Sequence, residues 1–485
     1  MIRFLHGDTE VSLEDWRADA TILDFLRDDP SRRGTKEGCA SGDCGACTVA
    51  VASSSDEGLS YAPVNACIAT LGSLHGKQLI TVEDLAEGGE PHPVQSALID
   101  CHGSQCGFCT PGFVMSLFVF FHSERNPDRE SIVEALGGNL CRCTGYRPIV
   151  DAAVQALEGS REDHFGHREA ATLDRLRALS ETATELTALT RDETRYFRPE
   201  SREALTALLD AHDELRIIAG GTDLMLEQTQ GLQPLPMLVD LTGVHDLHEN
   251  EASREAIHIG AAVSHHEART TILADYPELG ELIERFGSLQ IRSQATVVGN
   301  IANASPIGDW PPVLIALEAQ LLLESSQGER RIPVEDFFLA YRQTALRSGE
   351  YLRRLSIPRR GPKLFLRAYK ISKRFEDDIS SVCGVFALTL DGDRINSARV
   401  AFGGMAAVPA RARHCEEALL NLDLRRDSLE EPAAALRQDF TPISDARASA
   451  TYRSLVAERL LDRLQAEYGG ENARVHAHVV SGTGG

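Results

Sequence analysis

The sequence predicts an α+β protein of several domains, and three features of the chain lead to this class. With 485 residues the chain has room for about three or four domains of ordinary size. The share of strand-like runs and helical segments changes along the chain, and these changes divide the chain into zones. Nine of the eleven cysteines lie between Cys39 and Cys143, so the chemistry of the first third differs from that of the rest.

Composition and charge narrow the classes of function. A content of 42% hydrophobic and 25% charged residues is ordinary for a globular protein with buried cores. The net charge of −23 is spread along the chain, which disfavours binding to nucleic acid or to anionic membranes. The opening residues show no apolar core of a secretion signal, and the longest apolar run, 113–121, is far shorter than the ~20 residues of a membrane-spanning helix. We therefore expect a cytoplasmic protein that binds neither nucleic acid nor membrane.

The N-terminal zones differ in their secondary structure. Residues 1–80 combine short strands with one helix, and Gly7-Asp8 is a hairpin turn signal. The expected strands are 2–6, 48–53 and 78–82, and the expected helix is 20–29. Residues 81–157 are expected to be helical, with Pro111 and Pro148 in the first turns of two helices. Residues 158–192 are charged and poor in aromatic side chains, which predicts a partly helical linker.

Two further zones follow the linker. Residues 193–370 alternate strands and helices, as in an α/β unit. Residues 371–485 begin with a charged loop and the apolar stretch 380–390, and they end in a long amphipathic helix at 448–469. The last residues, 475–485, are expected to form a loose tail.

Four early cysteines form a set with a distinctive spacing. Four residues separate Cys39 from Cys44, two separate Cys44 from Cys47, and nineteen separate Cys47 from Cys67. This is the spacing of plant-type ferredoxins for a 2Fe–2S cluster. The interspersed glycines allow the backbone to curl around a cluster and to point amide N–H groups at its sulfurs. Zinc is the alternative, but zinc sites favour paired CxxC arms, and this stretch holds only one such pair.

A second set of four cysteines follows in two close pairs. Cys106 and Cys109 lie in QCGFCTPGF, and Cys141 and Cys143 lie in LCRCTGYRP. Each pair directly precedes a helix that is expected to open at a proline, so the positive ends of two helices would face one anionic, thiolate-ligated cluster. Taken alone, this set is less specific than the first. The other cysteines lie outside these spacings and are expected to be bystanders or ordinary buried thiols: Cys101, Cys383 and Cys415.

The sequence lacks the two standard nucleotide-binding motifs, but two other segments suit a dinucleotide. No G-x-G-x-x-G stands between a strand and a helix, and the near match to a phosphate loop at 72–77 lacks one residue and the final Ser or Thr. Residues 216–226, RIIAGGTDLML, join a strand, a Gly-Gly turn and a helix start, which offers amides and a hydroxyl to a pyrophosphate. Residues 296–309, TVVGNIANASPIGD, gather small and amide-bearing side chains around Gly299. Tight turns between strands explain either segment equally well on its own.

Together these motifs resemble the xanthine dehydrogenase and aldehyde oxidase family of molybdenum hydroxylases. CxxxxCxxC with its distant fourth cysteine, QCGFCTPGF and CRCTGYRP carry the resemblance over residues 1–157. The resemblance implies a β-grasp, ferredoxin-like 2Fe–2S domain at 1–80 and a four-helix 2Fe–2S bundle at 81–157. It further implies a two-lobed α/β FAD-binding domain of the vanillyl-alcohol-oxidase-like type at 193–370 and an α+β C-terminal lobe at 371–485. The implied electron order is molybdenum, helical-domain cluster, ferredoxin-like cluster and flavin.

The resemblance also implies which residues hold FAD. The flavin pyrophosphate would lie on Ile218, Ala219, Gly220, Gly221, Thr222, Asp223 and Leu224. The ribityl and pyrophosphate parts would also meet Thr296, Gly299, Asn300 and Asp309. Phe286 would lie against the isoalloxazine ring, Leu352 near the adenine, and Lys370 beside the flavin as the candidate catalytic residue, with the loop 373–380. Relatives carry Glu where Asp223 stands and a second Gly where Val298 stands, which puts in doubt only how closely the backbone approaches there.

Partners and reaction follow from the same resemblance. Clusters and flavin fused on one chain, with no room after the C-terminal lobe for molybdopterin domains, resemble the small subunit of two-subunit bacterial xanthine dehydrogenases. We therefore expect a molybdopterin-binding large subunit in a heterodimer paired into a heterotetramer, NAD as electron acceptor, and xanthine or hypoxanthine as substrate. An aldehyde or N-heterocycle hydroxylase is the runner-up. A stand-alone iron–sulfur flavoprotein and a zinc-stapled binding protein without redox role are the alternatives from other classes.

Overall fold

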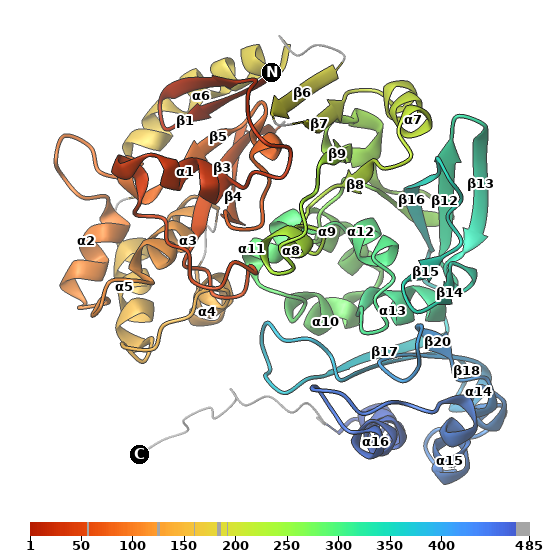
Figure 1. The fold of residues 1–485 in the computed structure, drawn as a ribbon. Coiled ribbons are helices and arrows are strands. Elements are labelled where there is room, and N and C mark those ends of the chain that lie inside the picture. Colours follow the sequence, from red (N-terminus) through yellow and green to blue (C-terminus); the bar gives the residue numbers. More distant parts are fainter. Residues whose placement is uncertain (56–57, 124–126, 160, 182–185, 192, 472–485) are drawn as a thin grey trace, which may run out of the picture.

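The computed structural model describes residues 1–55, 58–123, 127–159, 161–181, 186–191 and 193–471. Figure 1 shows the N-terminal domains, in red to yellow, beside the green middle part, with the blue C-terminal lobe beyond it. The arrangement is the multidomain α+β class that the sequence predicts, with mixed sheets and separate helical layers. Within the described residues, no helix combines the length and apolarity needed to cross a membrane. The predicted tail, 475–485, lies outside the described residues.

The first domain is a five-stranded mixed sheet crossed by one helix. Its strands are β1 (Ile2–His6), β2 (Thr9–Leu13), β3 (Thr48–Ser55), β4 (Gly58–Asn65) and β5 (Gln78–Ile80), in the order β2-β1-β5-β3-β4. β1 and β5 run parallel, and the other neighbours run antiparallel. Helix α1 (Ile22–Asp28) is capped by the preceding residue, Thr21, and its apolar face is buried. This sheet with one crossing helix matches the expected β-grasp fold.

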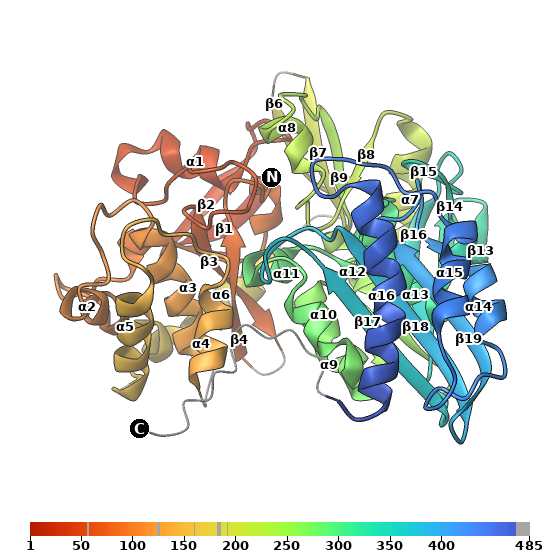
Figure 2. The ribbon, with the colours of Figure 1, turned by 90° about the horizontal axis from the view of Figure 1, so that it is seen from below.

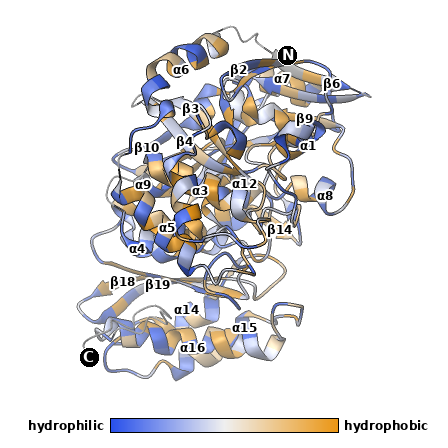
Figure 3. Ribbon diagram, turned by 90° about the vertical axis from the view of Figure 1, so that its left-hand side faces the viewer, coloured by the Kyte–Doolittle hydropathy of each residue, from blue (hydrophilic) through white to orange (hydrophobic). Residues whose placement is uncertain are grey.

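Four helices form the second domain, and a fifth connects it onward. They are α2 (Pro93–Asp100), α3 (Thr110–Ser123), α4 (Arg129–Leu136) and α5 (Arg147–Glu158), followed by α6 (His164–Glu181). Pro111 and Pro148 lie in the first turns of α3 and α5, as predicted. Figure 3 shows α3 as a hydrophobic helix, and it is buried almost throughout because it packs on β3 and β4 as well as on its own bundle.

The middle part has two lobes, each built on its own sheet. The first lobe holds β6 (Leu186–Arg191), β7 (Thr194–Pro199), β9 (Met237–Asp240) and β8 (Arg216–Ile218) in that order, with α7 (Arg202–Ala211) and α8 (Met225–Thr229). The second lobe holds β10 (Asn250–Ala252), β11 (Ala256–Gly260), β16 (Tyr351–Pro358), β12 (Gln320–Ser325) and β13 (Gly328–Pro333). Its helices are α9 (His265–Asp275), α10 (Gly280–Glu284), α11 (Leu289–Gln294), α12 (Val297–Ala302) and α13 (Trp310–Ala316). A small hairpin, β14 (Phe338–Ala340) with β15 (Gln343–Thr344), extends from this lobe.

The predicted linker is more structured than its composition indicates. Helix α6 packs on β1, β3 and β4 of the first domain. Strand β6, which also lies in the predicted linker, pairs with β7 as the edge of the first-lobe sheet. A short alternating run such as LTALTR is a weak strand signal by itself, and it forms a strand here because a partner strand follows directly.

The C-terminal lobe is an antiparallel sheet covered by helices. Its strands are β17 (Leu364–Ile371), β18 (Val382–Asp391), β19 (Arg394–Gly403) and β20 (Ala410–Arg411), and its helices are α14 (Arg413–Leu419), α15 (Glu430–Asp439) and α16 (Ala450–Tyr468). Figure 2 shows α16 lying across this sheet. Seven short 3₁₀ turns complete the described connections: Pro30–Arg32, Leu71–Leu74, Val82–Asp84, Leu241–Gly243, His245–His248, Pro277–Leu279 and Val334–Asp336.

Candidate functional site

The loop before β3 and the turn after β4 bring the first four cysteines together. Hydrogen bonds from the thiols of Cys44 and Cys67 lower the pKa of Cys39 far below its ordinary range. Cys67 also contacts Cys47. The backbone N–H groups of Ser41 and Cys44 lie 3.4 Å from Cys39 Sγ. Four converging sulfurs with amides directed at them fit the donor set that an anionic 2Fe–2S cluster requires.

Glycines make this loop possible. A Cβ on Gly38 would lie 2.8 Å from Cys44 Sγ, so a larger residue would displace this sulfur atom. Gly42 and Gly45 have φ of +78° and +67°, a region that favours glycine. The side-chain amide of Asn65 donates to the Gly42 carbonyl at 2.8 Å and holds the curled backbone in place.

The second set of cysteines also converges, from two loops that each open a helix. Cys106 and Cys109 precede α3, while Cys141 and Cys143 precede α5. Cys109 contacts Cys141, and Cys143 contacts Cys106. Burial raises the pKa of Cys109 to about 12, and although burial opposes it, hydrogen bonds from Thr144 lower the pKa of Cys141 to about 7. These sulfurs likewise fit one 2Fe–2S cluster. The other three cysteines stand apart, because Cys101 contacts Gln155 while Cys383 and Cys415 are buried elsewhere.

The two cysteine sites touch through the backbone. The Leu140 N–H donates to the Cys44 carbonyl at 3.0 Å, and Leu140 directly precedes Cys141. The Asn139 side-chain amide donates to the Gly45 carbonyl, also at 3.0 Å. A single hydrogen bond therefore connects Cys44, a predicted ligand of one site, to the neighbour of Cys141, a predicted ligand of the other.

The first cysteine loop also contacts the middle part of the chain. The Gln230 side chain, just after α8, donates to the Cys39 carbonyl at 2.9 Å. A Cβ on Gly221, whose φ is +72°, would lie 3.5 Å from the Ile68 carbonyl oxygen, beside Cys67. The Gly-Gly turn predicted to hold a pyrophosphate thus lies next to the first cysteine site.

The structure brings the two glycine-bearing segments together. A Cβ on Gly220 would lie only 2.0 Å from the Gln294 carbonyl oxygen, two residues before Thr296. Thr296 caps α12 by accepting the Gly299 N–H at 3.0 Å. The Asn300 Oδ1 atom is buried without a hydrogen-bond partner among the described residues. An unsatisfied acceptor beside closely packed glycines is what a polar ligand such as FAD would complete.

The rest of the first segment lies beside a short hairpin. Asp223 interacts with Arg342, between β14 and β15, and with the Asn303 side chain. Ile218 ends β8 and is buried, whereas the following residues keep part of their surface accessible: Ala219, Thr222 and Leu224.

Lys370 lies in this region but is not exposed. Its Nζ forms an ion pair with Asp309 Oδ2 at 2.6 Å, and the two side chains are only 3% and 5% exposed. The Ser380 hydroxyl donates to the other oxygen of Asp309 at 2.5 Å. The predicted catalytic lysine, the predicted ligand Asp309 and the end of the charged loop therefore form one buried cluster.

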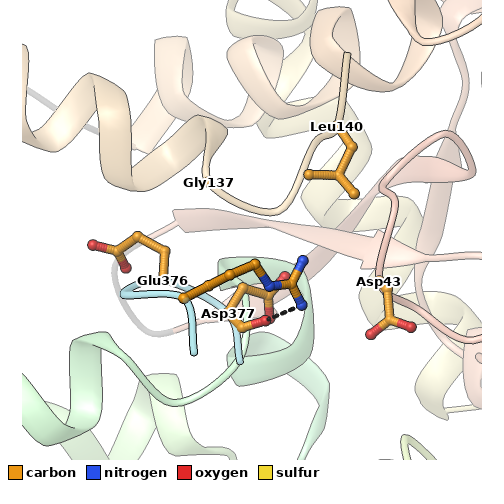
Figure 4. A pocket seen from close by; sticks show the side chains of 6 residues that line it. Asp43, Gly137, Leu140, Glu376 and Asp377 are labelled. Carbon is orange, nitrogen blue, oxygen red and sulfur yellow. Dashed lines mark hydrogen bonds between the residues drawn. The ribbon is translucent and has the colours of Figure 1, made fainter. Parts of the chain in front are cut away.

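The charged loop faces the iron–sulfur domains. A cleft of about 230 Å³ lies between them, lined by Asp43, Gly137, Leu140, Arg374, Glu376 and Asp377 (Figure 4). Burial, with a contribution from Asp43, raises the pKa of Asp377 to about 6. The loop is therefore part of an interdomain surface, and it is more than a charged loop exposed to solvent.

Three aromatic side chains pack together beside the second predicted flavin segment, where the His265 backbone N–H donates to the Ala295 carbonyl at 2.9 Å. The Phe286 ring lies 4.2 Å from the His265 ring, and Trp310 Nε1 donates to His265 Nδ1 at 2.9 Å. The proton of neutral His265 is then on Nε2, which is buried without a partner among the described residues. Burial lowers the pKa of His265 to about 3. Leu352 is buried on β16, which packs on α12.

Several of these residues carry no signal that local sequence reasoning detects. Gln230 directly follows α8 and His265 begins α9, and the partners of both side chains lie in distant segments. Asn139 is different, because it lies two residues before Cys141. Its position next to the motif CRCTGYRP could have indicated a role at the second cysteine site.

Four family models each match a separate stretch of the chain. Residues 7–71 match the 2Fe-2S iron-sulfur cluster binding domain, and 81–154 match a [2Fe-2S] binding domain. Residues 191–360 match the FAD binding domain in molybdopterin dehydrogenase, and 367–468 match the CO dehydrogenase flavoprotein C-terminal domain.

Relatives and solved structures agree with these matches. Xanthine dehydrogenase of Emericella nidulans is 34% identical over 94% of this chain and 38% of the relative. Xanthine dehydrogenase 1 of Arabidopsis thaliana is 31% identical over 90% and 37%. The chain thus spans somewhat more than a third of the length of these relatives. Among solved structures, a chain of CO dehydrogenase from Oligotropha carboxidovorans has 27% identity and a TM-score of 0.52, over 55% of this chain and 94% of that one. A chain of quinoline 2-oxidoreductase from Pseudomonas putida 86 has 26% identity and the same TM-score, over 56% and 94%.

Two cysteine sites fitted to 2Fe–2S clusters, in contact with an FAD-binding domain, define an iron–sulfur flavoprotein of the oxidoreductase class. The chain belongs to the molybdenum hydroxylase family, whose 2Fe–2S and FAD-binding portion it carries.

Proposed function

We propose that this chain is the electron-transfer subunit of a cytoplasmic xanthine dehydrogenase. It would take electrons from a molybdopterin-binding large subunit, pass them through its two cluster sites to FAD, and deliver them to NAD as xanthine or hypoxanthine is hydroxylated. Bound at these sites, 2Fe–2S clusters carry single electrons, and FAD exchanges electrons with them and hydride with a nicotinamide.

The observation that carries the proposal is the serial contact between the sites. Leu140, next to Cys141, donates to the Cys44 carbonyl, and Gly221 packs beside Ile68, next to Cys67. The ferredoxin-like loop therefore lies between the helical-domain site and the flavin segments. This order supports electron entry at the helical domain and exit at the flavin.

Exposed side chains around the helical-domain site support a partner there. Cys106 and Cys143 are exposed at the surface. Phe108 and Leu140 are each 47% exposed, and Tyr146 is 40% exposed. Apolar residues around exposed redox ligands form the kind of surface that a partner subunit covers. We propose that the molybdenum subunit docks there, in a heterodimer that pairs into a heterotetramer.

For the acceptor, we propose that NAD approaches the flavin near the loop 373–380 and the predicted site residues around Lys370. Because Lys370 is buried against Asp309, its role would be to hold Asp309 and the loop in place for FAD. The residues from Ile218 to Leu224, with Thr296, Gly299 and Asn300, would bind FAD, Phe286 would flank its ring, and Leu352 would line the adenine side.

A reconstitution experiment tests the division of labour. The purified chain should oxidise NADH with an artificial dye and should not oxidise xanthine, whereas added molybdenum subunit should restore xanthine-dependent NAD reduction. Xanthine oxidation by this chain alone would refute the partner proposal. Failure of NADH to bleach the flavin would refute NAD as the acceptor.

A second candidate has a specific observation in its favour. A solved structure over which this chain aligns is named quinoline 2-oxidoreductase. An N-heterocycle or aldehyde hydroxylase would use the same electron-transfer chain with a different molybdenum subunit. The substrate that bleaches the flavin in the copurified complex distinguishes these candidates from xanthine dehydrogenase.

A further inference from the structure

Gln290 occupies the point where three domains meet. It lies on α11 of the middle part and is completely buried. Its Nε2 is 3.3 Å from Thr48 Oγ1 on β3, 3.1 Å from Ser116 Oγ on α3, and 3.1 Å from Asn139 Oδ1 in the loop after α4. One side-chain amide therefore contacts both iron–sulfur domains from the FAD-binding domain.

The neighbouring hydroxyls fix the orientation of this amide. Thr48 Oγ1 donates its proton to the Gly45 carbonyl at 2.7 Å. Ser116 Oγ donates its proton to Asn139 Oδ1 at 2.6 Å. Both hydroxyl protons are thus used, so each oxygen can only accept from Gln290, which must present its NH₂ group to them. This amide has two N–H groups for three acceptors, and two of those acceptors keep another donor without it: Thr48 Oγ1 accepts from Asn139 Nδ2 at 3.3 Å, and Asn139 Oδ1 accepts from Ser116. Removal of the amide takes the donor away from Ser116 Oγ and breaks the link to α11, and the loss of a buried donor costs stability.

The same network reaches both cysteine loops. Asn139 accepts from Gln290 through Oδ1 and donates through Nδ2 to the Gly45 carbonyl at 3.0 Å. The next residue, Leu140, donates to the Cys44 carbonyl and precedes Cys141. Locking the Asn139 turn therefore sets the spacing between ligand residues of the two sites.

Close backbone packing restricts how the two cysteine loops and Gln290 can move relative to one another. A Cβ on Gly138 would lie 2.1 Å from Gln290 Oε1, and a Cβ on Gly45 would lie 2.2 Å from the Gly138 carbonyl oxygen. A Cβ on Gly112 would lie 2.1 Å from the Gly45 carbonyl oxygen. Three glycines allow the two loops to approach each other, and the Gln290 amide ties that contact to α11.

We propose that Gln290 is a positioning residue for electron transfer, whose amide holds the two cluster sites at their working distance from each other. The inference rests on the proposed relay between the sites. In this step one electron moves from the cluster site of Cys141 to the cluster site of Cys44. The helical-domain cluster is oxidised, the ferredoxin-like cluster is reduced, and no bond forms or breaks. Gln290 contributes to this step by geometry, since it contacts no cysteine ligand in the described structure.

Electron paramagnetic resonance of the dithionite-reduced full chain tests the proposal. Two reduced clusters at a fixed short distance split each other's signals through spin coupling. Gln290→Leu should narrow or abolish this splitting while both signals remain. Gln290→Glu should do so more strongly, because an isosteric carboxylate places an acceptor against three acceptors. If Gln290 merely filled space, the isosteric Glu variant would be the milder of the two.

The matched control is Gln320→Leu, on β12 of the second-lobe sheet, away from both cysteine sites (Figure 1). It should leave the splitting unchanged. Unchanged splitting in Gln290→Leu at full iron content, or a milder effect of Glu than of Leu, would overturn the proposal. If the Gln290 variants lose iron, the variants Ser116→Ala and Thr48→Val, which each delete one acceptor of the Gln290 amide, replace them as the test. Narrowed splitting in these variants supports the proposal, and wild-type splitting overturns it. No NAD or partner subunit enters the measurement, so its failure leaves the NADH assay of the proposed function intact.

Discussion

Removal of the Lys370 ammonium group is expected to destabilise the FAD-binding part strongly. Lys370→Met keeps most of the side-chain volume but leaves the Asp309 carboxylate buried without its cation. Breaking a buried ion pair from one side costs about 3–5 kcal/mol. Because Ser380 still donates to Asp309, we expect the lower end of this range, about 3 kcal/mol.

Thermal unfolding gives a direct readout of this cost. For a domain of this size, 1 kcal/mol corresponds to roughly 2–4 °C, so the midpoint of flavin release should fall by about 6–12 °C. Flavin fluorescence reports this transition, and the visible absorbance of the clusters reports the iron–sulfur domains separately. Only the flavin transition should move, since a chain of several domains unfolds in more than one step.

Two comparison variants decide whether the ion pair is responsible. Lys373→Met, in the exposed part of the same loop, should change the midpoint by less than about 2 °C, because exposed substitutions cost at most about 0.5 kcal/mol. Lys370→Met combined with Asp309→Leu should recover much of the loss in far-UV circular dichroism, because no unpaired charge remains. A Lys370→Met midpoint within about 2 °C of the wild type, or a double variant less stable than the single one, would refute the reasoning.

Three further predictions concern the flavin segments and the helical domain. Asn300→Leu should lower flavin content at unchanged iron content, because it removes a buried acceptor in one domain only; full flavin occupancy would place the site elsewhere. Gly220→Ala should also weaken flavin binding and cost about 1–3 kcal/mol, since its Cβ meets backbone atoms; an unchanged flavin-release midpoint would contradict this. Although burial opposes it, hydrogen bonds from His122 and His92 hold the pKa of Asp163 well below its usual range. The ionised Asp163 side chain therefore contributes its full stabilisation above the ordinary Asp pKa and loses it as pH falls through the lowered pKa. Asp163→Asn should make the free energy of unfolding depend less steeply on pH in the acid range. Parallel curves of unfolding free energy against pH for the variant and the wild type would contradict this.

The cluster sites were the most predictable part of the protein. The predicted ligands Cys39, Cys44 and Cys47 lie close together in sequence, so spacing alone restricts the geometry of their short loop. The helix starts at Pro111 and Pro148 were predictable for a similar reason, since proline acts within one turn.

Contacts between domains were not predictable from local patterns. The approach of Gly220 to Gln294 and the position of Gln290 depend on how the domains dock, which no single segment encodes. The burial of Lys370 depends in the same way on Asp309, sixty-one residues earlier. The roles assigned to individual flavin residues remain predictions that flavin-binding measurements on variants would test.

The central claim is that two distinct 2Fe–2S sites lie in series with FAD on this one chain. Iron analysis and electron paramagnetic resonance of the reduced protein test it most directly. The wild type should contain about four irons per chain and show two separable signals. Cys44→Ser should remove one signal and Cys109→Ser the other, each with the remaining site intact. Loss of both signals from one substitution in a folded chain would contradict the two-site account.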